Sequence, residues 1–94
     1  MRENRKQAEC EVVIVNRQGL HARPVMRFVD LASTFSSSVR VQRDTQEVDG
    51  KSPMEMMLLE ATQGTVLRLI AQGEDAAAAV AALVGLVNDK FGED

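Results

Sequence analysis

The stretch Gly19-Leu20-His21-Ala22-Arg23-Pro24 marks the point where a predicted strand gives way to a predicted helix, and it holds the only histidine of the 94-residue sequence. Pro24 is compatible with a helix only in its first turn, because proline lacks the N–H that interior positions donate. The helix must therefore begin close to His21. This stretch places the histidine at a helix N-terminus.

The segments on both sides of this stretch alternate between strand and helix patterns. Strands are expected at about 10–15, 39–43, 46–49 and 65–71, and helices at about 21–35, 53–59 and 76–90. Period-two alternation and β-branched residues mark the strands, whereas a period of three to four marks the helices. Segment 65–71 is apolar almost throughout, which predicts a central strand. The order predicts an α+β fold, with a four-stranded antiparallel sheet and helices on one face.

Composition limits the classes of function that this chain can have. With 94 residues, 45% of them hydrophobic, we expect a flexible tail at 1–8 and a single domain at 9–94. A net charge of −3 and the lack of Trp and Tyr argue against nucleic-acid binding. The longest apolar stretch, 76–86, is about half the ~20 residues needed to span a bilayer, so we expect a soluble protein. A single cysteine, Cys10, cannot close an intrachain disulfide, which fits a reducing cytoplasm.

His21 is the candidate nucleophile. The first N–H groups of a helix are unpaired and carry partial positive charge, so they favour a bound phosphoryl group. Arg23 can donate further hydrogen bonds to the same oxygens. A neutral imidazole can attack a phosphoryl donor at cytoplasmic pH. The sequence has no zinc-ligand cluster and no glycine-rich nucleotide loop. We therefore expect a chain that receives and passes a group without a cofactor or metal, and that is not an enzyme by itself.

A second set of signals precedes the short helix. Ser52 is placed to cap the helix N-terminus, Pro53 occupies the first helical position and Glu55 completes a capping box. Capping alone is sufficient to explain Ser52. Methionines at helical spacing are more often core residues, but a short helix cannot bury every face. We therefore expect Met54 and Met57 to be exposed.

Four motifs occur in a characteristic order: Gly-Leu-His-Ala-Arg-Pro at 19–24, Lys51-Ser52 before a methionine-rich helix, Gln63-Gly64-Thr65, and Gly73-Glu74-Asp75-Ala76. Together they resemble HPr, the histidine-containing phosphocarrier family of the sugar phosphotransferase system, from about Glu9 to Phe91. The resemblance implies an open-faced sandwich of four antiparallel strands and three helices. It also implies a carrier that takes a phosphoryl group from enzyme I, charged from phosphoenolpyruvate, and hands it to the IIA domains of sugar permeases.

The resemblance assigns roles to individual residues. His21 matches the histidine that is phosphorylated on Nδ1, Arg23 matches the arginine beside it, and Ser52 matches the serine that an ATP-dependent kinase phosphorylates in many bacteria. The first two helices form the family's docking surface. Its candidate members here are Arg17, Leu20, Pro24, Arg27, Pro53, Met54 and Met57. Pro53 and Glu55 depart from the common pattern at this surface, which puts recognition by the usual serine kinase in question.

Two functions from different classes stay open at this point. The first is a phosphocarrier acting through a transient phosphohistidine on His21, which we expect to be monomeric and cytoplasmic. The second is a regulatory binding module that is controlled by phosphorylation of Ser52 and contacts a kinase or a transcription regulator. A structural domain without phosphoryl chemistry would require His21 to be buried.

Overall fold

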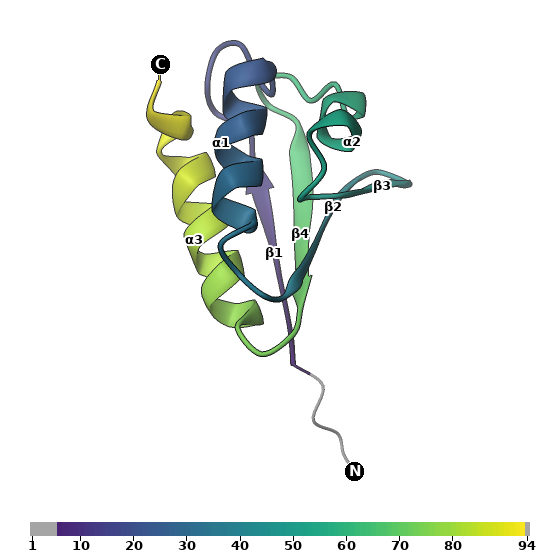
Figure 1. Cartoon of the computed structure of the whole chain (residues 1–94). Coiled ribbons are helices and arrows are strands. Elements are labelled where there is room, and N and C mark those ends of the chain that lie inside the picture. The colour runs from purple at the N-terminus through teal and green to yellow at the C-terminus, as the bar shows by residue number, and fades with distance from the viewer. Residues whose placement is uncertain (1–5, 94) are drawn as a thin grey trace.

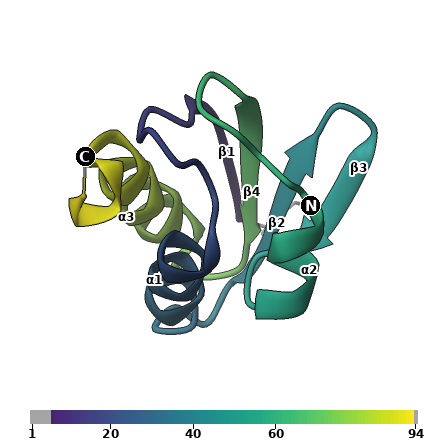
Figure 2. The same cartoon turned by 90° about the horizontal axis from the view of Figure 1, so that it is seen from above.

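Three helices cover one face of a four-stranded sheet and leave the opposite face open (Figure 1, Figure 2). The structure is a computed structural model that describes residues 6–93. Its elements, in chain order, are β1 (Gln7–Val13), α1 (Ala22–Ala32), β2 (Ser38–Arg43), β3 (Gln46–Asp49), α2 (Pro53–Leu58), β4 (Val66–Gln72), α3 (Ala76–Asn88) and the single 3₁₀ turn η1 (Lys90–Gly92). The predicted order of elements and the predicted α+β open-faced sandwich are confirmed.

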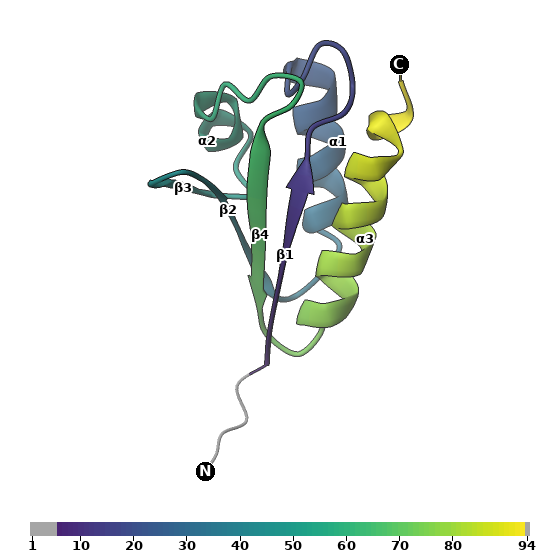
Figure 3. The ribbon, with the colours of Figure 1, turned by 180° about the vertical axis from the view of Figure 1, so that it is seen from behind.

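The sheet is antiparallel throughout, with the strand order β1-β4-β2-β3. Strand β4 lies between β1 and β2, and its Leu69 pairs with both Cys10 and Val41. Figure 3 shows β1 and β4 in front of the helices when the molecule is seen from behind. The central position predicted for β4 from its apolar sequence is therefore confirmed.

The first strand begins earlier than we predicted. Gln7 and Ala8, which we placed in an N-terminal tail, pair with Gln72 and Ala71 of β4. The polar residues of β1 face the open side of the sheet, so their alternation extends the strand before its β-branched part. Residues 1–5 of the predicted tail lie outside the described residues.

Two helices end before their predicted limits. Helix α1 ends at Ala32 rather than near Phe35, because the N–H groups of Thr34 and Phe35 donate to the carbonyls three residues before them, and the N–H groups of Ser36 and Ser37 then donate to the Asp75 carboxylate, each at 2.9 Å. Helix α3 ends at Asn88, and the chain then turns through the left-handed region. In both places the apolar spacing in the sequence continues past the residue at which the helix ends in the folded protein.

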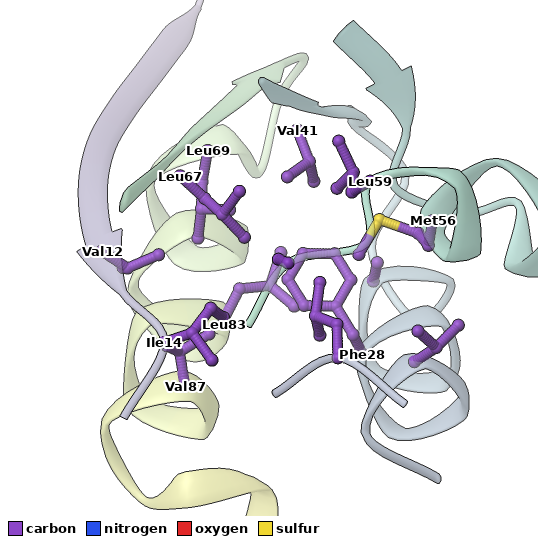
Figure 4. Close-up of a cluster of buried hydrophobic side chains, with 14 of the residues drawn as sticks. Val12, Ile14, Phe28, Val41, Met56, Leu59, Leu67, Leu69, Leu83 and Val87 are labelled. Atoms are coloured by element: carbon purple, nitrogen blue, oxygen red, sulfur yellow. The ribbon is translucent and has the colours of Figure 1, made fainter. Parts of the chain in front are cut away.

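The core lies between the sheet and the helices and receives side chains from every layer (Figure 4). Its fully buried large residues are Ile14, Val25, Phe28, Val39, Val41, Met56, Leu59, Leu67, Leu69, Leu83, Val87 and Phe91. Cys10 is partly buried beside the alanines of α3. Among residues 6–93, no helix has the length and apolar character needed to cross a membrane.

Candidate functional site

The turn between β1 and α1 requires a glycine. Gly19 has a φ of +68°, and a Cβ at this position would overlap the carbonyl oxygen of Ala61. The backbone here is held by hydrogen bonds on both sides of the turn: Leu20 N–H donates to Ala61 O at 2.9 Å and His21 N–H donates to Gly19 O at 3.0 Å. Gly19 therefore permits the turn that sets the position of His21.

His21 is the N-cap of α1, as its sequence position predicted. Its backbone is extended, and its carbonyl accepts the first helical hydrogen bond, from Val25 N–H at 3.1 Å. The side chain does not cap the helix, and it is 36% exposed. The imidazole is thus free of a capping role and reachable from solvent. Its exposure rules out the purely structural alternative that required a buried histidine.

Glu93 contacts the histidine ring, which sequence analysis did not anticipate. Its Oε1 lies 2.9 Å from His21 Nε2 and 3.0 Å from Nδ2 of Asn16. An ionised carboxylate can only accept hydrogen bonds, so this contact requires a proton on Nε2, and in the neutral ring the lone pair then lies on Nδ1. The hydrogen bond from His21 lowers the pKa of Glu93, partial burial opposes this, and Asn16 and the charges of His21 and Arg23 add to the lowering.

Asn16 fixes the orientation of the Glu93 carboxylate through a hydrogen bond. It is fully buried, and its Nδ2 donates to Gly19 O at 2.8 Å as well as to Glu93. Its Oδ1 has no partner among the side chains and backbone of residues 6–93, so the amide is oriented by its two acceptors. The sequence signal for this residue was weak, because a polar residue after a strand usually indicates a turn.

A partly open recess lies beside the ring. Its lining residues are Arg17, Gln18, His21, Arg23 and Glu93. The recess has a volume of about 300 Å³, which is at the lower limit of ordinary ligand pockets and suits a small anionic group. Two exposed guanidinium groups can donate to such a group, and a single carboxylate offsets part of their charge. The arrangement can hold a phosphoryl group next to a nucleophilic nitrogen.

Comparison with known proteins identifies the family to which this chain belongs. A family model described as the PTS HPr component phosphorylation site matches residues 8–89. The chain belongs to the HPr family. The phosphocarrier protein HPr of Neisseria meningitidis is 45% identical over 82 residues, which cover 87% of this chain and 92% of that protein. The resemblance inferred from the motifs is therefore confirmed, and with it a phosphocarrier of the phosphotransferase system.

Solved HPr-family structures share the fold. HPr-C-His from Thermoanaerobacter tengcongensis has a TM-score of 0.90 and 46% identity, covering 93% of this chain and 98% of that chain. The Bacillus subtilis catabolite repression protein Crh, crystallised as a swapped dimer, has a TM-score of 0.72 and 40% identity, covering 79% of this chain and 85% of that chain. The fold thus occurs both in proteins that are named as phosphocarriers and in one that is named for catabolite repression.

Two of the seven docking residues expected from the HPr family are buried. Leu20 is 6% exposed and belongs to the core, and Pro24 lies on the buried face of α1. Pro24 turns inward because the apolar stripe of α1 begins in its first turn. These two residues therefore present little surface to a partner. Arg17 and Arg27 are exposed, and Arg27 lies beside Gly92.

Helix α2 begins as predicted, although its capping differs in one bond. Ser52 Oγ accepts from Glu55 N–H at 3.2 Å, which is the expected cap. The Glu55 side chain does not return to Ser52. It accepts from Asp49 N–H at 3.0 Å instead, because Ser52 N–H already donates to Asp49 O. The second half of the predicted capping box is therefore wrong.

The exposed methionines of α2 were predicted correctly. Met54 is 81% exposed and Met57 is 44% exposed, whereas Met56 is buried. Met26 of α1 and Leu58 of α2 are also exposed, and sequence analysis did not single them out. Helices α1 and α2 contact each other, so these side chains come from one pair of neighbouring helices (Figure 2).

Proposed function

We propose that this chain accepts a phosphoryl group from enzyme I on Nδ1 of His21 and passes it to the IIA domains of sugar permeases. It is an HPr-family phosphocarrier, and the proposal concerns its acceptor atom and partners. The observation that carries it is the partly exposed ring of His21, whose Nε2 is engaged by Glu93. Nδ1 accepts no hydrogen bond among residues 6–93, so it is the nitrogen available for attack.

The surroundings of the ring suit a covalent holder. Arg23 and Arg17 can stabilise the phosphoryl oxygens, and the N-terminus of α1 adds partial positive charge. Neither arginine forms an ion pair within residues 6–93, which leaves both guanidinium groups available to a new anion. The chain would act as a covalent intermediate, and its partners would supply the donor and the acceptor of each transfer.

The proposed docking surface lies on α1 and α2 around the histidine. Its exposed members are Arg17, Arg27, Pro53, Met54 and Met57. Methionine side chains adapt to differently shaped partners, which suits a protein that must bind both a donor and several acceptors. The basic residues favour partners with an acidic rim. Such a carrier would work in the cytoplasm as a monomer and would need no cofactor.

A phosphotransfer assay tests this function. The wild-type chain incubated with enzyme I and labelled phosphoenolpyruvate should acquire an acid-labile, base-stable phosphate. His21→Ala should acquire none, whereas Ser52→Ala should be labelled as the wild type is, because Ser52 lies on another helix. Phosphorus NMR of the product should report an Nδ1 phosphohistidine. Absence of label on the wild-type chain, or label on His21→Ala, would contradict the proposal.

A second candidate is a regulatory module controlled through Ser52. It is favoured by the similarity to Crh and by the position of Ser52 at the N-terminus of α2, where a phosphate group meets partial positive charge. The presence of His21 with Arg23 argues against regulation as the only function. Binding of the kinase or transcription regulator should be measured with each site phosphorylated in turn. An effect from Ser52 alone would favour this second function.

A further inference from the structure

The C-terminal segment is built to bring Glu93 to the histidine. After α3, Lys90 and Phe91 have φ values of +58° and +56°, and Gly92 has +79°. Two successive non-glycine residues in the left-handed region are unfavourable unless other contacts hold them. Phe91 supplies such contacts, because it is 1% exposed and lies in the main core. The buried ring therefore holds the turn that delivers Glu93.

The carboxylate is then fixed from a third part of the chain. Asn16, in the loop between β1 and α1, donates to the same Oε1 that contacts the histidine ring. Asn16 also holds Gly19 O, in the turn that places His21. A single buried amide thus links the position of the histidine to the position of its carboxylate partner.

We propose that Glu93 is a positioning residue for phosphoryl transfer: it holds the Nε2 proton of His21 both before and after the phosphoryl group is bound to Nδ1. This inference rests on the proposed function. In the free protein the contact keeps the lone pair on Nδ1. In the phosphorylated protein it keeps the second ring nitrogen protonated. The two ring nitrogens lie on different sides of the imidazole, so the carboxylate and the phosphoryl group do not compete for one place.

The transfer balances without movement of a proton. The Nδ1 lone pair forms the N–P bond while the bond from phosphorus to the donor breaks and its electron pair leaves with the donor. The ring of His21 then carries a positive charge and keeps its Nε2–H, which donates to Glu93. On transfer to an acceptor, the N–P bond breaks and its electrons return to Nδ1. Neutral imidazole departs, which is a better leaving group than the imidazolate that would form without the Nε2 proton.

Three variants test this role. Glu93→Ala removes the carboxylate that accepts the hydrogen bond from His21 Nε2, and Glu93→Gln keeps a neutral acceptor. Glu74→Gln is the control: it removes one negative charge from an exposed side chain at the other end of α3. Long-range proton–nitrogen NMR of the unphosphorylated proteins should show the Nε2–H tautomer in the wild type and in Glu74→Gln. The spectrum of Glu93→Ala should show a mixture of tautomers, and that of Glu93→Gln should lie between these.

Transfer kinetics give the second readout. The rate of phosphorylation by phosphorylated enzyme I should fall about tenfold in Glu93→Ala, a typical loss when the partner that orients a histidine is removed. It should be unchanged in Glu74→Gln. A wild-type tautomer and rate in Glu93→Ala would overturn the inference. The two proposals can fail separately. If Glu93 controls the tautomer but the wild-type chain takes no phosphate from enzyme I, the proposed function is wrong, and the role of Glu93 in the transfer rate is wrong with it, whereas its control of the tautomer stands.

Discussion

Two carboxylates lie at opposite ends of α3, and each reaches a segment that flanks α1. Asp75, before α3, accepts hydrogen bonds from the backbone of Ser36 and Ser37 and from the Ser37 hydroxyl. Glu93, after α3, accepts from the ring of His21 and from Asn16. The two contacts tie α3 to α1 at both ends, yet their donors differ in chemistry.

The donors determine what each end can do. Amide N–H groups and a hydroxyl do not titrate in the ordinary range and offer no nucleophile here, so the Asp75 contact has a structural role. The imidazole of His21 has a second nitrogen that can form a bond while the first remains held. Asp75 thus makes a purely structural contact at one end of α3, which we call the fixed joint, whereas Glu93 forms part of a reactive site at the other end. The following predictions test this difference, from the largest expected effect to the smallest.

Phe91→Ala should remove the buried ring that holds the turn before Glu93. Loss of this buried ring should cost about 3 kcal/mol in the free energy of unfolding, as measured by urea titration. The turn that carries Glu93 should also loosen, so NMR of His21 should show a mixture of tautomers. Phe35→Ala is the matched control, because Phe35 is only partly buried and packs against the alanine-rich cluster that includes Ala76. Equal costs in the two variants, or an unchanged tautomer in Phe91→Ala, would contradict the comparison.

Gly19→Ala should disturb the histidine end through the backbone. The new Cβ would overlap Ala61 O, and the position has a positive φ, so we expect a loss of about 2 kcal/mol and slower phosphoryl acceptance. Gly64→Ala is the control, since Gly64 also has a positive φ but has open space around it. Its loss should be about 1 kcal/mol, with a normal acceptance rate. Similar losses for both would show that the close approach to Ala61 is unimportant.

Asp75→Asn should weaken the fixed joint in a pH-dependent way. The hydroxyl of Ser37, followed by the N–H of Ser36, lowers the pKa of Asp75 from 3.8 to about 2. A lowered pKa in the folded state stabilises the protein above the unfolded-state value, and this contribution is lost as the pH falls toward the folded-state value. The thermal midpoint of Asp75→Asn should therefore lie a few degrees below that of the wild type at pH 7. The difference should shrink between about pH 4 and pH 2.

The neighbouring variant Glu74→Gln provides the reference for this pH dependence. Glu74 is exposed, and within residues 6–93 it pairs only with Lys6, at 3.2 Å, so its removal should change the midpoint little. A gap between Asp75→Asn and wild type that stays constant from pH 4 to pH 2 would show that the Asp75 charge is not what holds Ser36 and Ser37.

Ser52→Ala should have the smallest effect. It removes the bond from Ser52 Oγ to Glu55 N–H, which should cost about 1 kcal/mol of stability, the usual value for a lost helix cap. Urea titration measures this loss. Phosphorylation of His21 should be unaffected. A changed tautomer of His21 in this variant would show that the cap of α2 and the histidine site are coupled, contrary to expectation.

Much of the fold could be predicted because its signals are local. The almost continuous apolar sequence of β4 indicated a central strand, Pro53 marked the start of α2, and the exposure of Met54 and Met57 followed from the shortness of that helix. Each depends on residues within a turn or a strand of one another. The inward orientation of Leu20 and Pro24 was missed, because residues beside a reactive side chain can face either the core or a partner.

Local sequence was sufficient to locate the reactive residue: a glycine, a histidine and a first-turn proline in six positions place His21 at the start of a helix wherever that helix packs. The choice of reactive nitrogen depends on Glu93, which is separated from His21 by 72 positions. That contact requires the left-handed turn at Lys90 and Phe91, and this turn persists only because Phe91 is buried in a core contributed by distant segments. Such a contact has no local pattern, because it exists only once the sheet and the three helices have assembled.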